Sequence, residues 1–126
     1  MDAANRSIIA YVACRLITGA TGWWMRDHDR RRPVQFEGFI EPGSVKVYSH
    51  ELHSHLLGGG AEGKYQLFQH GVGGAVDLLI NAEEHTFSGC EHETGYRFFG
   101  YVEERTIRLF DYQDLHWHLY TLKGAG

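Results

Sequence analysis

Proline, cysteine and long apolar runs are scarce in this sequence, and each shortage excludes a class of protein. Its 126 residues include two prolines and two cysteines, which are too few for a disulfide framework or an all-cysteine zinc site. The first apolar stretch, residues 7–17, is shorter than the roughly 20 residues that cross a bilayer, and Asp2 stands where a signal peptide would be basic. A net charge of −4 argues against a nucleic-acid or anionic-membrane partner. We therefore expect a cytoplasmic protein in which Cys14 and Cys90 are reduced.

Length and composition predict a single folded domain over residues 1–126. A chain of this size buries roughly two-thirds of its unfolded surface, and its hydrophobic and charged fractions, 43% and 22%, are typical of a globular domain. Sixteen glycines without a repeating period predict many tight turns. Nine histidines are the unusual feature.

The apolar pattern predicts one helix near the start of the chain. Between residues 5 and 18, Ile9, Val12 and Leu16 recur with the helical period, and Gly19 follows as a typical C-terminal stop. One apolar stripe implies that the helix packs against the rest of the domain. We expect it to close one end of that domain.

From residue 34 onward, short β-type runs alternate with turn residues at a spacing of roughly ten. We expect strands at 34–40, 44–57, 64–70, 75–80, 84–87, 95–102, 105–111 and 116–122. The separators include the glycine-rich segments 58–60, 71–74 and 88–90, and the long 44–57 run predicts a bend. Consecutive hairpins favour an all-β fold with one N-terminal helix, namely an antiparallel up-and-down barrel of about eight strands, because closure removes exposed sheet edges.

Several short motifs are similar to those of an uncharacterised, mostly bacterial family of lipocalin-like (calycin-type) β-barrels. The corresponding pieces between residues 8 and 102 are Leu16, Gly22-Trp23-Trp24, Arg26, Phe36-Glu37-Gly38, Val47-Tyr48, Lys64-Tyr65 and the set Cys90, Glu93 and Tyr96. The resemblance implies a lipocalin-like barrel. It implies no function, since the family has none assigned and its closing Gly-Pro-Arg-Lys element has no counterpart here.

Four of the nine histidines form two alternating pairs. Glu51, His53 and His55 are expected on one face of a strand, and His116 and His118 on one face of another. Two His-x-His pairs are able to converge on one divalent metal, as in cupin enzymes, although the other cupin motifs do not follow in this sequence. The alternative is a polar stripe that faces a lumen or solvent.

Two smaller clusters also allow a chemical and a structural interpretation. Cys90 precedes Glu91-His92-Glu93, so a nucleophilic cysteine is one hypothesis, but neighbouring carboxylates disfavour the thiolate that it needs. The run 30–32 consists of three arginines. It either binds an anion at the barrel mouth or forms a solvated loop.

Aromatic residues on nearly every expected strand indicate either a ligand cavity in the lumen or a solid core. The leading hypothesis is a protein that binds a small apolar or aromatic molecule in a lumen lined by aromatic and histidine side chains. Its expected polar anchors are Tyr48, His53, His55, Tyr65, His116 and His118. The alternative is a small enzyme, either dependent on a metal held by His53, His55, His116 and His118 or acting as a metal-free isomerase or cyclase. A third hypothesis is an interaction module that forms a homodimer through an exposed sheet face or edge.

Overall fold

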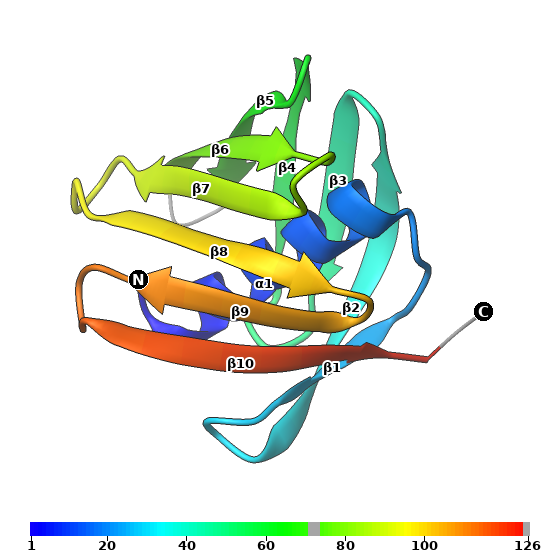
Figure 1. The fold of residues 1–126 in the computed structure, drawn as a ribbon, viewed down its shortest axis with the longest axis vertical. Helices are drawn as coiled ribbons and strands as arrows, with labels where there is room; N and C mark the ends of the chain where they lie inside the picture. Colours follow the sequence, from blue (N-terminus) through cyan, green and yellow to red (C-terminus); the bar gives the residue numbers. More distant parts are fainter. Residues whose placement is uncertain (71–73, 125–126) are drawn as a thin grey trace.

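The computed structural model describes residues 1–70 and 74–124 and shows a closed antiparallel β-barrel (Figure 1). One helix, α1 (Ala3–Thr18), precedes the strands. The described residues form ten strands: β1 (Trp24–Asp27), β2 (Arg32–Glu41), β3 (Ser44–Ser49), β4 (Ser54–Ala61), β5 (Lys64–Gln69), β6 (Ala75–Asn81), β7 (Thr86–Glu91), β8 (Arg97–Glu103), β9 (Thr106–Asp111) and β10 (His116–Lys123). Each strand pairs with its neighbours in sequence, and β10 pairs with β1. The predicted antiparallel barrel with an N-terminal helix is confirmed, whereas the expected number of about eight strands is wrong.

Two features account for the additional strands. The four-residue strand β1 closes the barrel against β10, and it is too short to show a β-type pattern. The expected single strand at 44–57 is instead two strands, β3 and β4, joined by a turn in which the Leu52 N–H donates to Ser49 Oγ at 3.1 Å. His53 in this turn has a φ of 51°, which reverses the chain where a bend was expected.

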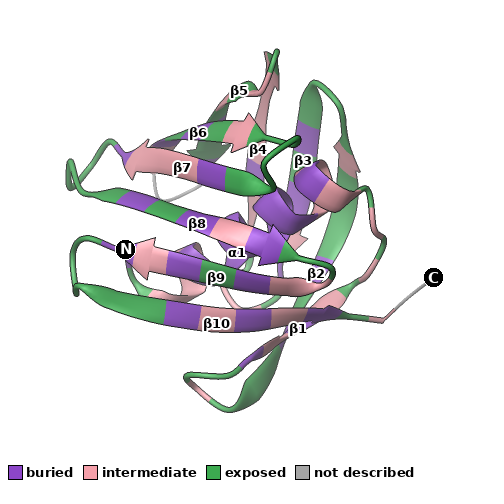
Figure 2. Cartoon of the chain, in the orientation of Figure 1, coloured by how far each residue is buried: buried purple, intermediate pink, exposed green. Residues whose placement is uncertain are grey.

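Helix α1 lies inside the barrel rather than across one end (Figure 1). Every residue from Arg6 to Cys14 is buried, and the helix contacts β2, β6, β8, β9 and β10. Figure 2 shows buried residues along the helix and alternating with exposed ones along the strands. A helix buried on all sides has no polar face, so the predicted single apolar stripe is wrong. Within the described residues, no helix is both long enough and apolar enough to cross a bilayer.

Glycines on the inner face of the barrel make room for aromatic rings. Gly89 on β7 pairs with Phe98 on β8, and Gly100 on β8 pairs with Phe87 on β7. A Cβ atom on Gly89 would lie 2.4 Å from the Phe98 ring, and one on Gly100 would lie 2.5 Å from the Phe87 ring. Each phenylalanine therefore covers the glycine of the neighbouring strand, an arrangement known to stabilise sheets.

The glycine-rich segments expected to be turns lie largely within strands. Residues 58–60 belong to β4 and residues 88–90 to β7, while 71–73 of the segment 71–74 lie outside the described residues. Several turns instead place a residue with a side chain in the left-handed region: Arg31, His53, Glu62, His85, Glu104 and Leu115. Such positions are uncommon for residues other than glycine, so these turns carry little signal in the sequence.

Candidate functional site

The predicted anchors Tyr48 and His55 lie on the outer face of the barrel. They stand directly opposite each other on β3 and β4, and their rings meet edge to face with centroids 5.0 Å apart. Their strand neighbours Val47 and Leu56 are buried, so strand alternation turns Tyr48 and His55 away from the helix. They line an outer depression of about 360 Å³ and not the lumen.

Tyr65 lies at the mouth of the barrel where α1 ends. Its hydroxyl oxygen accepts a hydrogen bond from the Gly43 backbone N–H at 3.2 Å. A cavity of about 770 Å³ opens here, with Tyr65, Ile40 and Ile80 among its walls. Its lining also includes three glutamates, Glu41, Glu62 and Glu83. Tyr65 therefore borders a cavity, but this cavity is at the mouth because α1 occupies the lumen.

His118 is buried at the opposite mouth, on the inner face of β10. Its Nε2 lies 2.8 Å from Asp114 Oδ2, and its Nδ1 contacts Asp29 Oδ2. Each ring nitrogen thus faces a carboxylate oxygen, and the ring joins the β1–β2 turn to the β9–β10 turn.

The remaining members of the two His-x-His pairs lie elsewhere. His53 occupies the β3–β4 turn, and His116 is exposed at the start of β10. The expected placement of Glu51, His53 and His55 on one strand face is wrong, because the chain turns at His53. Among the described residues no group of three or more His, Cys, Asp and Glu side chains is placed to hold a metal ion. The described residues therefore offer no site for the divalent metal of the enzyme hypothesis.

Arg30, the first residue of the arginine run 30–32, is engaged by carboxylates of the protein itself. Arg30 Nε lies 2.6 Å from Asp27 Oδ2, and Arg30 Nη2 lies 3.0 Å from Glu51 Oε1. Hydrogen bonds to Glu51 and Asp27 raise the pKa of Arg30 despite its partial burial. Arg30 therefore connects the β1–β2 turn to the β3–β4 turn, and its guanidinium is not available to an external anion.

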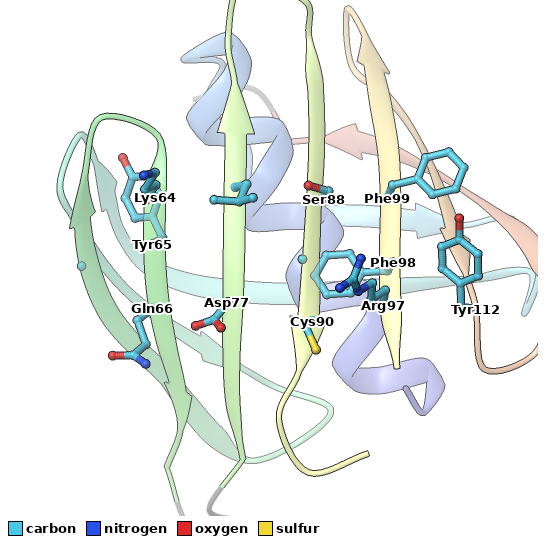
Figure 3. A pocket seen from close by; sticks show the side chains of 13 residues that line it. Lys64, Tyr65, Gln66, Asp77, Ser88, Cys90, Arg97, Phe98, Phe99 and Tyr112 are labelled. Atoms are coloured by element: carbon cyan, nitrogen blue, oxygen red, sulfur yellow. The ribbon is translucent and has the colours of Figure 1, made fainter. Parts of the chain in front are cut away.

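A groove of about 720 Å³ lies over the outer face of β5 to β8 (Figure 3). The outward residues of β7, Ser88 and Cys90, are small and form its floor. Leu79 on β6 and Phe99 on β8 stand opposite Ser88 on either side, at the spacing of about 4.5–5.5 Å that separates paired side chains. The segment 88–90, which was expected to be a turn, thus forms a depression in the surface between the larger side chains of Leu79 and Phe99.

Aromatic side chains continue from the groove across the outer face of the barrel. Phe99, Phe110, Tyr112 and Trp117 form what we call the outer aromatic cluster, in which Phe99 lies with ring centroids 5.5, 5.9 and 5.4 Å from the other three. Phe99 is 37%, Tyr112 46% and Trp117 49% exposed. Exposed apolar clusters mark interaction sites, so the cluster and the groove form one candidate surface.

The end of the groove around Cys90 is polar. Cys90 stands between Asp77 on β6 and Arg97 on β8, and Asp77 Oδ2 lies 2.8 Å from His92 Nε2. The Cys90 thiol is directed at two backbone carbonyl oxygens, at 3.7 and 3.8 Å. A nucleophilic cysteine needs a base within hydrogen-bond reach, and no hydrogen bond joins Cys90 to His92 in the described part of the chain. The catalytic-cysteine hypothesis therefore gains no support.

The groove residues Leu79, Ser88 and Phe99 were not among the predicted site residues. The sequence of β8 does indicate an outward-facing aromatic residue, because adjacent Phe98 and Phe99 must face opposite sides of the sheet. One of two adjacent rings on a barrel strand is necessarily outside, so the pair predicts an exposed aromatic residue. Alternation was expected to turn half of the aromatic residues into the lumen or core, and no site was predicted for the outward half.

Comparison with known proteins gives no relative from which a site could be transferred. The chain matches no protein-family model, no curated protein and no solved structure. The lipocalin-like resemblance of residues 8–102 therefore stays a prediction. Function has to be inferred from the groove, the mouth cavity and the side chains that line them.

Proposed function

We propose that this protein binds a small apolar or aromatic molecule, and that the groove over β5–β8 is its site. The observation that carries the proposal is the position of Ser88, a small residue flanked in register by Leu79 and Phe99. An apolar molecule placed there covers Leu79 and the exposed edge of Phe99, and removing such surface from water yields roughly 25 cal/mol per Å². The neighbouring outer aromatic cluster adds ring surface for stacking.

The lumen is a weaker location for such a ligand. Ile9 and Val12 of α1 are at most 1% exposed, as is Leu109 of β9, so helix side chains already fill this part of the barrel interior. The mouth cavity beside Tyr65 offers a single aromatic ring among its lining residues, whereas the groove is lined by the exposed rings of Phe99 and Tyr112. The ligand class expected from the sequence is kept, and its place moves to the outer surface.

The test uses N-phenyl-1-naphthylamine, an uncharged aromatic dye that fluoresces in apolar surroundings. We expect saturable binding to the native protein. Ser88→Trp fills the floor between Leu79 and Phe99 and should weaken binding at least about tenfold, the loss expected when roughly 1.4 kcal/mol of contact is removed. The matched control is Thr106→Trp, since Thr106 on β9 stands opposite Glu103 and Thr121, and none of these residues lines the groove. Equal affinity in the two variants, or no saturable binding to the wild type, contradicts the proposal.

The other hypotheses stay predictions. A metal-dependent enzyme needs at least three converging ligands, which the described residues do not provide, and the outer aromatic cluster also suits a homodimer interface. Light scattering across a hundredfold range of protein concentration separates the homodimer from the binder. Ligand binding without a mass change supports the proposal, and a dimer that excludes the dye replaces it. We also propose that the barrel is related to the lipocalin-like family and that the protein is cytoplasmic.

A further inference from the structure

Two cationic side chains line the groove, and neither has an anionic partner in the described part of the chain. Lys64 lies at the start of β5 and Arg97 at the start of β8. Over residues 1–70 and 74–124, no carboxylate oxygen lies within 4.0 Å of either cation. The groove's own carboxylate, Asp77, is occupied instead by His92 at 2.8 Å. Within residues 1–70 and 74–124, these two cations of the groove are therefore not neutralised by an ion pair.

Arg97 is the better placed of the two cations. It stands opposite Cys90 in the register, and the Tyr112 N–H donates to its backbone oxygen at 3.1 Å. Figure 3 shows its guanidinium beside Cys90, over the floor of the groove, whereas Phe99 and Tyr112 lie together on the other side of β8. Lys64 is three strands away, roughly 14 Å at the usual strand spacing, so one small ligand group contacts Arg97 or Lys64 but not both.

The spacing along β8 fixes the shape of a suitable ligand. Arg97 and Phe99 are two residues apart on the same face of the strand, which is about 7 Å. Ser88 stands opposite Phe99 in the register, so an anionic group held by Arg97 places a directly attached aromatic ring over Ser88. A planar carboxylate matches the guanidinium with two parallel hydrogen bonds. We propose that the ligand is an aromatic monoanion whose carboxylate binds Arg97, an inference that rests on the proposed function of the groove.

Three naphthalene compounds of matched size test this inference by calorimetry: 2-naphthoate, the neutral 2-naphthylmethanol and the cationic 2-naphthylmethylammonium. We expect naphthoate to bind at least about fivefold tighter than the alcohol, as partly exposed charge-assisted hydrogen bonds allow, and the ammonium compound to bind weakest. Raising the ionic strength should weaken naphthoate binding and leave the alcohol unchanged.

Arg97→Gln should lower the affinity for naphthoate to that for the alcohol, and Arg97→Lys should give an intermediate value because it keeps the charge and loses the planar fork. The matched control is Arg108→Gln, which removes the same charge from an exposed position on β9 outside the groove. Near-ultraviolet circular dichroism checks that each variant is folded.

The outcomes separate this inference from the proposed function. If the alcohol binds and Ser88→Trp blocks it, but naphthoate binds no tighter, the groove stands and the anion preference is wrong. If none of the three compounds binds, both proposals fail. If Arg108→Gln weakens naphthoate as much as Arg97→Gln, the preference reflects overall charge, and the assignment to Arg97 is overturned.

Discussion

The ring of Tyr11, in the middle of α1, stacks on the ring of Phe36 in β2 with centroids 4.3 Å apart and an interplanar angle of 20°. Both side chains are 1% exposed. The Tyr11 hydroxyl donates to the Gly22 carbonyl oxygen at 2.6 Å and accepts from Arg15 Nη1 at 3.0 Å. Tyr11 therefore fastens the helix both to the barrel wall and to the segment that leads into β1.

Removal of the Tyr11 hydroxyl should destabilise the fold because the hydroxyl serves two partners. We expect Tyr11→Phe to lower the free energy of unfolding by about 1–2 kcal/mol, and Tyr11→Ala to lower it by about 3–5 kcal/mol because it also leaves a cavity beside Phe36. Urea unfolding measures both changes. Tyr101→Phe is the matched control, since no hydrogen bond to the Tyr101 hydroxyl is formed in the described part of the chain, and it should change stability by less than about 0.5 kcal/mol. Equal effects of Tyr11→Phe and Tyr101→Phe would show that the helix is not fastened through this hydroxyl.

Replacing Leu115 by glycine should stabilise the fold, although it removes a hydrophobic side chain. It lies in the β9–β10 turn with a φ of 58° and is 66% exposed, so its side chain contributes little burial and a left-handed backbone costs it roughly 1–2 kcal/mol. Leu115→Gly relieves this strain, but glycine also gains freedom in the unfolded chain. We expect a net stabilisation of about 0.5–1 kcal/mol. Leu115→Ala shortens the side chain without relieving the backbone and is the control, and a Gly variant no more stable than the Ala variant contradicts the interpretation.

The two cysteines should differ sharply in reactivity. Cys14 is completely buried in α1, and burial raises the pKa of its thiol to about 11 against weaker opposing effects of Thr18 and nearby arginines. Cys90 is partly exposed on the groove floor. At pH 8 we expect a disulfide reagent to modify one thiol per chain quickly and the second only on unfolding, with Cys90→Ala abolishing the fast phase. A fast phase that survives Cys90→Ala would show that α1 leaves the barrel readily.

Asp114 should make stability depend on pH in the acid range. Although its partial burial acts in the opposite direction, the His116 N–H, His118 and Arg6 together hold the pKa of its carboxyl below the ordinary value of 3.8. Because the folded pKa is lower than the unfolded one, this stabilisation is present above about pH 4 and is lost as the pH falls through the folded pKa. Asp114 is about a third exposed, so we expect less than about 1 kcal/mol.

The measurement for Asp114 is the free energy of unfolding at pH 6 and at pH 3. Asp114→Asn should reduce the difference between the two values relative to the wild type. Asp2→Asn changes a carboxylate that caps α1 and has no contact with His118, so it controls for the general loss of one acidic group. An unchanged difference in Asp114→Asn would contradict the ion-pair arrangement at this mouth.

Much of the fold follows from local sequence patterns. The alternation of apolar residues in β2, β5, β6 and β9 gave strands at the expected places, and Gly19 ends α1 as expected. Some turns place a residue other than glycine in the left-handed region, for example His53 and Glu62. Such turns are not predicted by the positions of the glycines. The strand count was underestimated for this reason and because β1 has only four residues.

The candidate site is harder to predict from the sequence than the fold. Alternation states that adjacent residues of a strand face opposite sides, but not which side is the interior. Tyr48 and His55 were placed inside, while Val47 and Leu56 are the buried residues. The choice depends on what fills the barrel, and that is α1, whose contacts with the strands are distant in sequence.

The sequence by itself determined two properties of this protein. The scarcity of cysteine excludes a disulfide framework, and the scarcity of proline together with the ten-residue spacing of turns predicts a continuous antiparallel sheet. These are local properties, since each hairpin is set by the residues at and beside its turn. Only the tertiary structure decided that the helix occupies the lumen and that Ser88 lies in a groove between Leu79 and Phe99. The physical reason is that burial and strand register depend on contacts between residues far apart in the chain, which a sequence pattern does not specify.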